Sequence, residues 1–342
     1  MKTIWKIIIG CIALGLILFV IGWILKPTGN IYMDRGGIHA SNGEDVQEVN
    51  ERNMQEFTEI NIDVASADIE FIEADDFGLE IYNDTRSPLT WSNKNGRLEV
   101  RHKNNMNIGL LDLVITGGDR NRSYVKVYFP ADVGFSRIDI GSASGNKNIV
   151  DFPELRVDEF MIDSISGNID VSGIIAGKLN ISSTSGRLSL SDVEAKEVAF
   201  DCISGNAKIT NLKADSLKYD KTSGEGDIID SNIGSLKLSS ISGGISLKNV
   251  DSEGLYVDSG SGNFEYQGSI EGDIKIDIIS GRVKLELSGS SDDYDKNIES
   301  ISGTTNIDGQ RFQGDINIRN DGKYKINIDS ASGNVNISFD RP

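Results

Sequence analysis

The stretch Ser166-Gly-Asn-Ile-Asp-Val171 opens a unit that returns along the chain at a constant interval. From Ser166 to Gly281 the Ser-Gly pair recurs every 19 residues, and further copies stand outside this run with looser spacing. A fixed period close to 20 residues predicts a solenoid, in which each repeat forms one coil stacked on the previous coil. The repeated glycines are Gly145, Gly167, Gly186, Gly205, Gly224, Gly243, Gly262, Gly281, Gly303 and Gly333.

Apolar residues within the unit predict the kind of coil. With the serine counted as position 1, positions 4 and 6 are apolar in most copies, and so are positions 14 and 16. Leu217 and Tyr219 in one copy, and Leu236 and Leu238 in the next, illustrate the second pair. A spacing of two is strand alternation, and the short repeat leaves too little room for a helix besides strands and turns. We therefore predict an all-β fold, a β-solenoid whose coils each hold two short strands and bury columns of aliphatic side chains.

The Ser-Gly-Asn signature indicates a corner of the coil. Glycine at position 2 suits a corner with a positive φ or a close approach of two backbones. The serine before it and the asparagine after it, as at Asn168 and Asn206, favour turns through local side-chain to backbone hydrogen bonds. A flexible Gly/Ser-rich linker is the alternative, and the strict apolar columns argue against it.

Residues 1–26 predict an N-terminal transmembrane anchor. The apolar run Ile7–Leu25 would span about 28 Å as a helix, close to the hydrocarbon thickness of a bilayer. Lys2 and Lys6 precede it, which places the N-terminus in the cytoplasm and the C-terminal domain outside, as a single-pass membrane protein. A cleaved signal peptide and a lipoprotein box at residues 8–11 are the alternatives. The first lacks a small-residue cleavage site, and the second has too short an apolar segment before it.

The remainder of the chain divides into three regions by its pattern. Residues 27–56 are polar, which predicts a juxtamembrane spacer with a short helix around Val46–Phe57. Residues 57–132 contain degenerate copies of the coil motif, such as Ser66–Phe71, and predict an irregular β cap that covers the open edge of the first coil. Residues 133–342 hold the β-solenoid repeats, and their looser spacing near the C-terminus predicts insertions in the turns or a closing cap.

The chain carries a formal net charge of −18. Its first 26 residues hold three lysines and no acid, so the rest holds 31 basic and 52 acidic residues, a net charge of −21. Such a surface repels nucleic acid, which excludes nucleic-acid binding. The two cysteines cannot pair, because Cys11 lies in the predicted anchor and Cys202 in a coil, where it is a small core or near-core residue.

Acidic residues recur at position 17, three residues before the next Ser-Gly pair. If the coils stack in register, their carboxylates form a column on one outer face, with neighbours about 4.8 Å apart. Such a column is a candidate site for a divalent cation such as calcium, for a sugar, or for the acid pair of a polysaccharide-cleaving enzyme. The alternative is a solvated face in which Lys218 and Lys275 neutralise Asp220 and Asp277. The candidate residues are Asp163, Asp201, Asp220, Asp258, Asp277, Glu299 and Asp329.

An N-terminal apolar helix, a strand ending in Tyr128-Phe129-Pro130 and iterated Ser-x-Ser-Gly units occur together in this chain. In this combination residues 57–342 resemble the bacterial family named "putative adhesin", a domain of unknown function that includes membrane proteins of the LiaG type. The resemblance implies a location in the bacterial cell membrane and a role in envelope-stress response or adhesion. Its motifs are structural repeats, specific for the fold, and it supplies no catalytic residues.

The sequence offers little for catalysis. The two histidines, His39 and His102, have no cysteine or second histidine beside them, and phosphate-loop and dinucleotide motifs are missing. We therefore expect no catalytic residue and no cofactor, and a non-enzymatic, membrane-anchored binding or scaffold protein of the cell envelope. A carbohydrate-active β-solenoid enzyme is the alternative. The expected partners are the lipid bilayer, through the N-terminal helix, and an envelope protein, a wall polymer or a cationic peptide.

Overall fold

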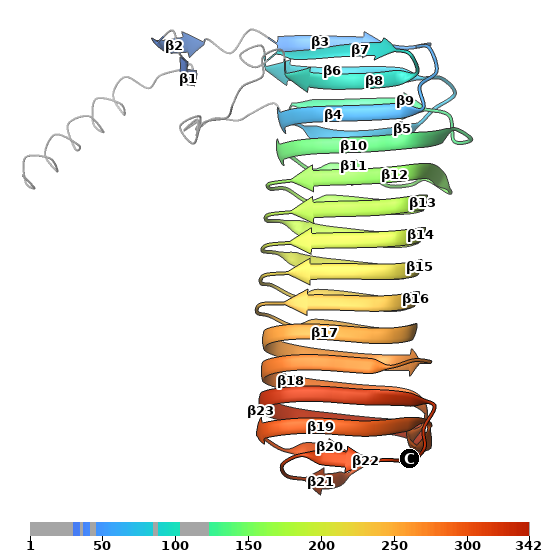
Figure 1. Cartoon of the computed structure of the whole chain (residues 1–342). Coiled ribbons are helices and arrows are strands. Elements are labelled where there is room, and N and C mark those ends of the chain that lie inside the picture. Colours follow the sequence, from blue (N-terminus) through green and yellow to red (C-terminus); the bar gives the residue numbers. More distant parts are fainter. Residues whose placement is uncertain (1–29, 35–36, 42–45, 85–87, 103–122, 342) are drawn as a thin grey trace, which may run out of the picture.

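The computed structural model describes residues 30–34, 37–41, 46–84, 88–102 and 123–341. Within them the chain is β-structure apart from one short 3₁₀ helix, η1 (Ser291–Asp293). Strands β1 (Asn30–Asp34) and β2 (Gly37–Ser41) form a separate antiparallel pair. All later strands, β3 to β23, belong to one sheet that winds into a stack of coils (Figure 1), so the predicted all-β solenoid is confirmed.

The predicted transmembrane anchor, residues 1–26, lies outside the described residues. In the part of the chain that the structure does describe, no helix has the length and apolar character needed to cross a membrane.

The regular coils stack in parallel with a register of one repeat. Leu217 pairs with Leu236, and Leu236 pairs with Leu255, so each residue lies beside its own copy in the next coil. All three leucines are buried, as the inward columns predict. The strands of this region are β12 (Leu155–Ser164), β13 (Ile169–Ser183), β14 (Arg187–Cys202), β15 (Asn206–Lys221), β16 (Gly226–Ser240), β17 (Ile245–Ile270) and β18 (Ile274–Ser290).

Each coil has three sides, where the sequence predicted two strands. In β13 a third buried pair, Ile174 and Ala176, stands between the two predicted pairs, and the pairing with β14 is interrupted at Gly173 and Gly177. The third pair holds small residues in several coils, which weakens its apolar signal. Position 8, at the second corner, has a positive φ in Asp151, Gly173, Asp192, Asn211, Asp230, Asn249 and Gly268.

The Ser-Gly-Asn corner is built from contacts between coils. Gly224 has φ +99°, and a Cβ on it would lie 2.0 Å from the carbonyl oxygen of Gly205 in the preceding coil. Ser185 Oγ donates to Ile165 O of the preceding coil at 3.2 Å, and Asn168 Oδ1 accepts the Arg187 N–H at 3.3 Å. The prediction of local turn bonds was therefore wrong, because these side chains bond to the neighbouring coil.

Position 18 forms a further inward column, which follows the apolar columns at positions 14 and 16 and carries buried polar side chains in most coils. Ser164 Oγ donates to the carbonyl of Ser166 at 3.0 Å and so satisfies a corner carbonyl. Cys202 and Lys221 replace serine in this column, and both are buried. Burial raises the pKa of the Cys202 thiol to about 11, as expected for the small core residue that the sequence predicted.

At the N-terminal end the coils do not follow chain order. Strands β4 and β5 pair with β10 and β11 on one side and with β8 and β9 on the other. Strands β3, β6 and β7 then add antiparallel pairings to this end (Figure 1). The strands are β3 (Val46–Glu51), β4 (Glu59–Ser66), β5 (Asp68–Glu73), β6 (Gly78–Asp84), β7 (Leu89–Lys94), β8 (Arg97–His102), β9 (Tyr124–Phe129), β10 (Gly134–Ser144) and β11 (Lys147–Ile149).

The short helix predicted around Val46–Phe57 was wrong. This segment contains strand β3, which pairs with β6 from Val46–Asp84 to Glu51–Leu79. The Gln47 side chain also bonds both the N–H and the carbonyl of Leu89, at 2.9 and 2.7 Å. The edge of β6 offers backbone hydrogen bonds to alternate residues of this six-residue segment, which outweighs a weak helical preference.

The C-terminal end also departs from chain order. Strand β23 lies between β18 and the pair β19–β20, which precede it in the sequence. Antiparallel strands β22 and β21 follow on β19 and β20 (Figure 1). The bounds are β19 (Tyr294–Ser302), β20 (Thr305–Ile307), β21 (Gln310–Phe312), β22 (Ile316–Ile318) and β23 (Tyr324–Arg341).

Candidate binding surface

One side of the coil carries the predicted acidic residues in a continuous line. The register pairs Asp201 with Asp220 and Asp258 with Asp277, while Ser182 and Ser239 fill the remaining levels. At the C-terminal end Asp277 pairs with Asp329, and Asp329 pairs with Glu299. We call this line the acidic column: Asp163, Ser182, Asp201, Asp220, Ser239, Asp258, Asp277, Asp329 and Glu299.

The column extends further toward the N-terminal end than the sequence indicated. Asp63 in β4 pairs with Gly141 in β10, and Gly141 pairs with Asp163. Asp63 was missed because the chain leaves the regular spacing between β5 and β10. Its position three residues before Ser66, in the degenerate motif, is the signal that could have located it.

Some charges of the column are neutralised by lysines on the same face. Lys275 Nζ lies 2.9 Å from Asp277 Oδ2, and Lys218 forms the equivalent ion pair with Asp220. The bond to the carboxylate raises the pKa of each lysine. These are the two pairs that the sequence offered as the alternative to a ligand site. Over the described residues, Asp163, Asp201 and Asp258 have no basic side chain in ion-pair contact.

Like charges meet where β23 enters the stack. Asp329 stands between Asp277 and Glu299. Partial burial raises the pKa of the Asp329 carboxyl, and the hydrogen bond and charge of Asp277, with the charge of Glu299, raise it further. Nevertheless, no three acidic, histidine or cysteine side chains in the described part of the chain are grouped so that they could hold one metal ion.

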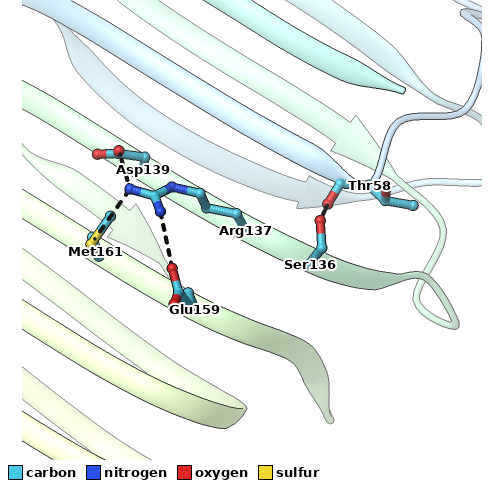
Figure 2. A network of polar contacts seen from close by, with 6 residues as sticks. All are labelled: Thr58, Ser136, Arg137, Asp139, Glu159 and Met161. Atoms are coloured by element: carbon cyan, nitrogen blue, oxygen red, sulfur yellow. Dashed lines mark hydrogen bonds and ion pairs between the residues drawn. The ribbon is translucent and has the colours of Figure 1, made fainter. Parts of the chain in front are cut away.

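Toward the N-terminal end the same face carries a closed charge network (Figure 2). Arg137 bonds Asp139 Oδ2 at 3.1 Å within β10 and Glu159 Oε2 at 3.0 Å in β12. Nearby, Ser136 Oγ donates to the Thr58 carbonyl at 3.1 Å. Arg137 thus neutralises one of these two carboxylates, and Asp163, which has no ion pair among the described residues, adds uncompensated negative charge in the same strand, β12.

A second line, which sequence reasoning missed, runs beside the acidic column. The residue before each Ser-Gly pair points outward, and it is isoleucine at every second level. These isoleucines are exposed, from 49% in Ile203 to 87% in Ile301. The signal was available as the alternation of the residue before Ser-Gly. We call this line the isoleucine column: Ile165, Thr184, Ile203, Thr222, Ile241, Gly260, Ile279, Ala331 and Ile301.

Lysine and tyrosine line the other side of the acidic column. Tyr256 pairs with Lys237 in the preceding coil and with Lys275 in the next. The two ammonium groups lie 5.7 and 5.4 Å from its ring centroid, within cation–π range. Three other aromatic side chains of the coils, Phe200, Tyr219 and Tyr266, are buried and so contribute no ring to this face.

Of the two histidine side chains, the structure describes that of His102. His102 Nε2 accepts the backbone N–H of Ala65 at 2.7 Å, a structural bond between β8 and β4. The side chain of His39 lies outside the described set.

A model of the family described as Toastrack DUF4097 matches residues 57–225 and, in a second match, residues 178–338. Similar solved structures include a "putative adhesin" from Bacteroides fragilis, 16% identical over 86% of this chain and 98% of that chain, with a TM-score of 0.41. A "putative adhesin" from Parabacteroides distasonis is 13% identical over 86% and 98% of the two chains, with a TM-score of 0.42. A "putative lipid binding protein" from the same species is 12% identical over 86% and 97%, with a TM-score of 0.39. No functionally curated protein matches the chain.

Proposed function

This chain belongs to the Toastrack DUF4097 family, and we propose that it is a non-enzymatic binding protein, anchored in the bacterial cell membrane, whose solenoid lies outside the cytoplasm. The run Ile7–Leu25 behind Lys2 and Lys6 supports the anchor and its orientation. A reporter that is active only outside the cytoplasm should therefore work when it is fused after Pro342. Activity of a cytoplasm-specific reporter at that place would contradict the orientation. A mature chain starting near residue 27 would contradict the anchor.

The observation that carries the binding role is the adjacency of the acidic and isoleucine columns. Along the chain the two columns are two residues apart, as Asp201 near the end of β14 and Ile203 in the corner after it are, which keeps their Cα atoms within about 7 Å of each other. A line of carboxylates beside a line of exposed apolar side chains complements a partner with a cationic edge and an apolar face. We therefore assign a cationic amphipathic peptide, or a segment of that kind in an envelope protein, as the partner.

Repetition of the columns favours an extended partner over a compact one. Isoleucine returns at every second level, about 10 Å along the axis, and the intervening levels carry small residues or threonine. Each contact is weak because exposed charges are screened and each isoleucine is only one apolar side chain. Several contacts made by one partner at once raise the overall affinity, because the later ones are intramolecular.

The carbohydrate-active alternative has one supporting observation. Neighbouring acids such as Asp201 and Asp220 lie on strands about 4.8 Å apart, a spacing close to the carboxylate separation typical of retaining glycosidases. A general acid, however, needs an apolar site that raises its pKa. Asp201 is exposed and Asp220 is ion-paired with Lys218, so this pair lacks that environment.

The binding role can be tested with a defined probe. The full chain, purified in a nonionic detergent, is titrated into a fluorescent 18-residue helical peptide of leucine and lysine, and binding is followed by anisotropy. Replacing Asp201, Asp220, Asp258 and Asp277 with Asn should weaken binding at least about tenfold. Replacing Ile203, Ile241 and Ile279 with Thr, the residue of the intervening levels, should weaken it similarly.

A matched control separates the site from the general charge of the protein. Asp170→Asn, Asp227→Asn, Glu225→Gln and Glu265→Gln remove the same number of charges from another side of the coils. This variant should bind within about twofold of the wild type. Equal weakening by both charge variants would mean that the peptide responds only to the net charge of the protein. Unchanged binding by the isoleucine variant would mean that the isoleucine column does not contact the peptide.

A further inference from the structure

A polar hollow of about 490 Å³ lies on a different side of the coils, at the C-terminal end. Three basic residues line it, Arg282 and Lys284 on β18 and Arg311 on β21. Asn334 and Asn336 of β23 also line it, as do Thr304, just before β20, and Asn306 on β20. These residues meet only because β23 lies between β18 and β20: Arg282 pairs with Asn334, and Asn336 pairs with Asn306.

Backbone bonds fix which polar atoms face the hollow. Asn334 Oδ1 accepts the Thr304 N–H at 3.2 Å, and Asn306 Oδ1 accepts the Gly309 N–H at 2.9 Å. The amide NH₂ group of each side chain is therefore left to donate. Arg311 Nη2 donates to Thr304 Oγ1 at 3.1 Å, which ties its guanidinium to the strand end beside Asn334. The lining thus presents mainly hydrogen-bond donors.

The charge of the hollow is opposite to that of the protein. The chain as a whole is at −18, yet the residues that line the hollow include three cations and no carboxylate. In the described part of the chain neither Arg282 nor Arg311 has a carboxylate in ion-pair contact, while Lys284 is paired with Glu286 at 2.7 Å. Two guanidinium groups therefore remain available to an anion.

We propose that this hollow binds a phosphate ester of a sugar or small polyol. Planar guanidinium groups bind phosphate through paired N–H donors, and amide NH₂ groups add neutral donors. The phosphate would sit over Asn334, one level from Arg282 and one level from Thr304, where Arg311 is held. The volume exceeds that of one phosphate, and the lining has no aromatic ring for a base, so the remaining space suits a hydroxylated group.

The test uses the full chain in nonionic detergent and isothermal titration with glycerol 3-phosphate. Glycerol, inorganic phosphate and chloride at equal ionic strength are the comparison ligands. Glycerol 3-phosphate should bind, and the double variant Arg282→Gln, Arg311→Gln should weaken that binding at least about tenfold. Lysine at both positions should restore part of the affinity, since it keeps the charge but loses the paired donors.

Arg187→Gln is the matched control, because Arg187 occupies the same repeat position as Arg282 but lies outside the hollow. It should bind as the wild type does. Binding to vesicles with phosphatidylglycerol, but not with phosphatidylcholine alone, and with the same dependence on Arg282 and Arg311, would identify a lipid headgroup as the source of the phosphate ester. Failure of glycerol 3-phosphate to bind better than chloride, or equal loss in Arg187→Gln, would overturn the proposal. The site is separate from the acidic and isoleucine columns and does not rest on the proposed function.

Discussion

The middle coils and the C-terminal end differ in which part of the chain lies next to each coil. In the middle, each residue lies beside the residue 19 positions later, as Asp258 lies beside Asp277. At the C-terminal end Asp277 lies beside Asp329, 52 positions later, and Glu299 comes one level beyond. Regular repeat spacing in the sequence is therefore found where consecutive repeats are neighbours in space. It is lost where the neighbour of a coil comes from a distant part of the chain.

The difference also shows how a solenoid ends. A parallel stack leaves backbone N–H and carbonyl groups unpaired at both ends, which invites pairing with another chain. Here β4–β5 at one end and β23 at the other are placed out of chain order, and antiparallel strands follow beyond them. Both ends thus use the same arrangement.

We expect the largest difference in stability between alanine substitutions at corner glycines and at glycines in open turns. Gly224→Ala would place a Cβ 2.0 Å from the Gly205 carbonyl oxygen, which requires two coils to move apart. Gly309 also has a positive φ, +83°, but no atom lies within 4 Å of its Cβ position. We expect Gly224→Ala to cost several kcal/mol or prevent folding, and Gly309→Ala to cost about 1–2 kcal/mol.

Urea unfolding followed by circular dichroism measures both variants. Similar midpoints would mean that the backbone conformation, not the close approach of the coils, accounts for glycine at the corner.

Inward and outward residues of one strand should differ almost as much. Leu236 is buried at 1% exposure between Leu217 and Leu255, while Lys237 beside it is exposed. Leu236→Asp buries an unpaired charge and should cost several kcal/mol. Lys237→Asp should cost below about 1 kcal/mol. Thermal unfolding compares them, and equal losses would mean that the inward and outward positions are wrongly assigned.

The joint between cap and regular coils should show a pH effect that comes from a buried lysine. Lys147 occupies a column that is isoleucine in its neighbours, and its Nζ donates to Gly145 O at 2.9 Å and to Ser164 Oγ at 2.6 Å. Burial lowers the pKa of this ammonium to about 8, against a smaller raising effect of Asp68. In the unfolded chain the pKa returns to about 10.4.

Between these two values the unfolded chain binds the proton that the folded chain has released. The stability contributed by Lys147 therefore rises with pH from about 8 to about 10. Unfolding free energies of wild type and Lys147→Met, measured at pH 7 and pH 9.5, should differ by a margin that moves in favour of the wild type at the higher pH. A constant margin would contradict the lowered pKa.

The smallest effect belongs to the acids around β23. Because the pKa of Asp329 is raised in the folded protein, its charged form costs stability above that pKa. Asp329→Asn should therefore raise the free energy of unfolding at pH 7 by less than about 1 kcal/mol, since the group is near solvent. The gain should vanish at pH 3, where the carboxyl is protonated. Thermal shifts at the two pH values check this, and Asp163→Asn, which has no acid directly beside it, is the control.

Much of the regular region could be predicted, because each coil packs on the copy one repeat away and equivalent positions therefore carry similar residues. The roles of Leu236 and Gly224 can be recognised because similar residues recur at the same repeat position, and the same holds for the acids from Asp201 to Asp277. The third side of the coil could not be read, since small residues such as Ala176 give little apolar contrast. The isoleucine column was overlooked because an apolar residue beside a corner resembles a core residue in sequence alone.

The ends could not be predicted for a different reason. The position of β23 between β18 and β19 depends on contacts across 52 residues, which no local period records. The hollow around Arg282 and Arg311 follows from that insertion, so its residues had no common signal in the sequence. The seven predicted acidic residues do form one column, but the order of the last three could only come from the structure.

The order of strands at the C-terminal end can be tested directly by disulfide formation. In a background with Cys11→Ser, one variant carries Asp277→Cys and Asp329→Cys, and a second carries Asp277→Cys and Glu299→Cys. If β23 lies between β18 and β19, the first pair stands about 4.8 Å apart and the second about 10 Å, too far to bridge. Mild oxidation and peptide mass spectrometry should find the 277–329 disulfide. A 277–299 disulfide in its place would show that the coils follow chain order and would contradict both the fold of this end and the hollow built on it.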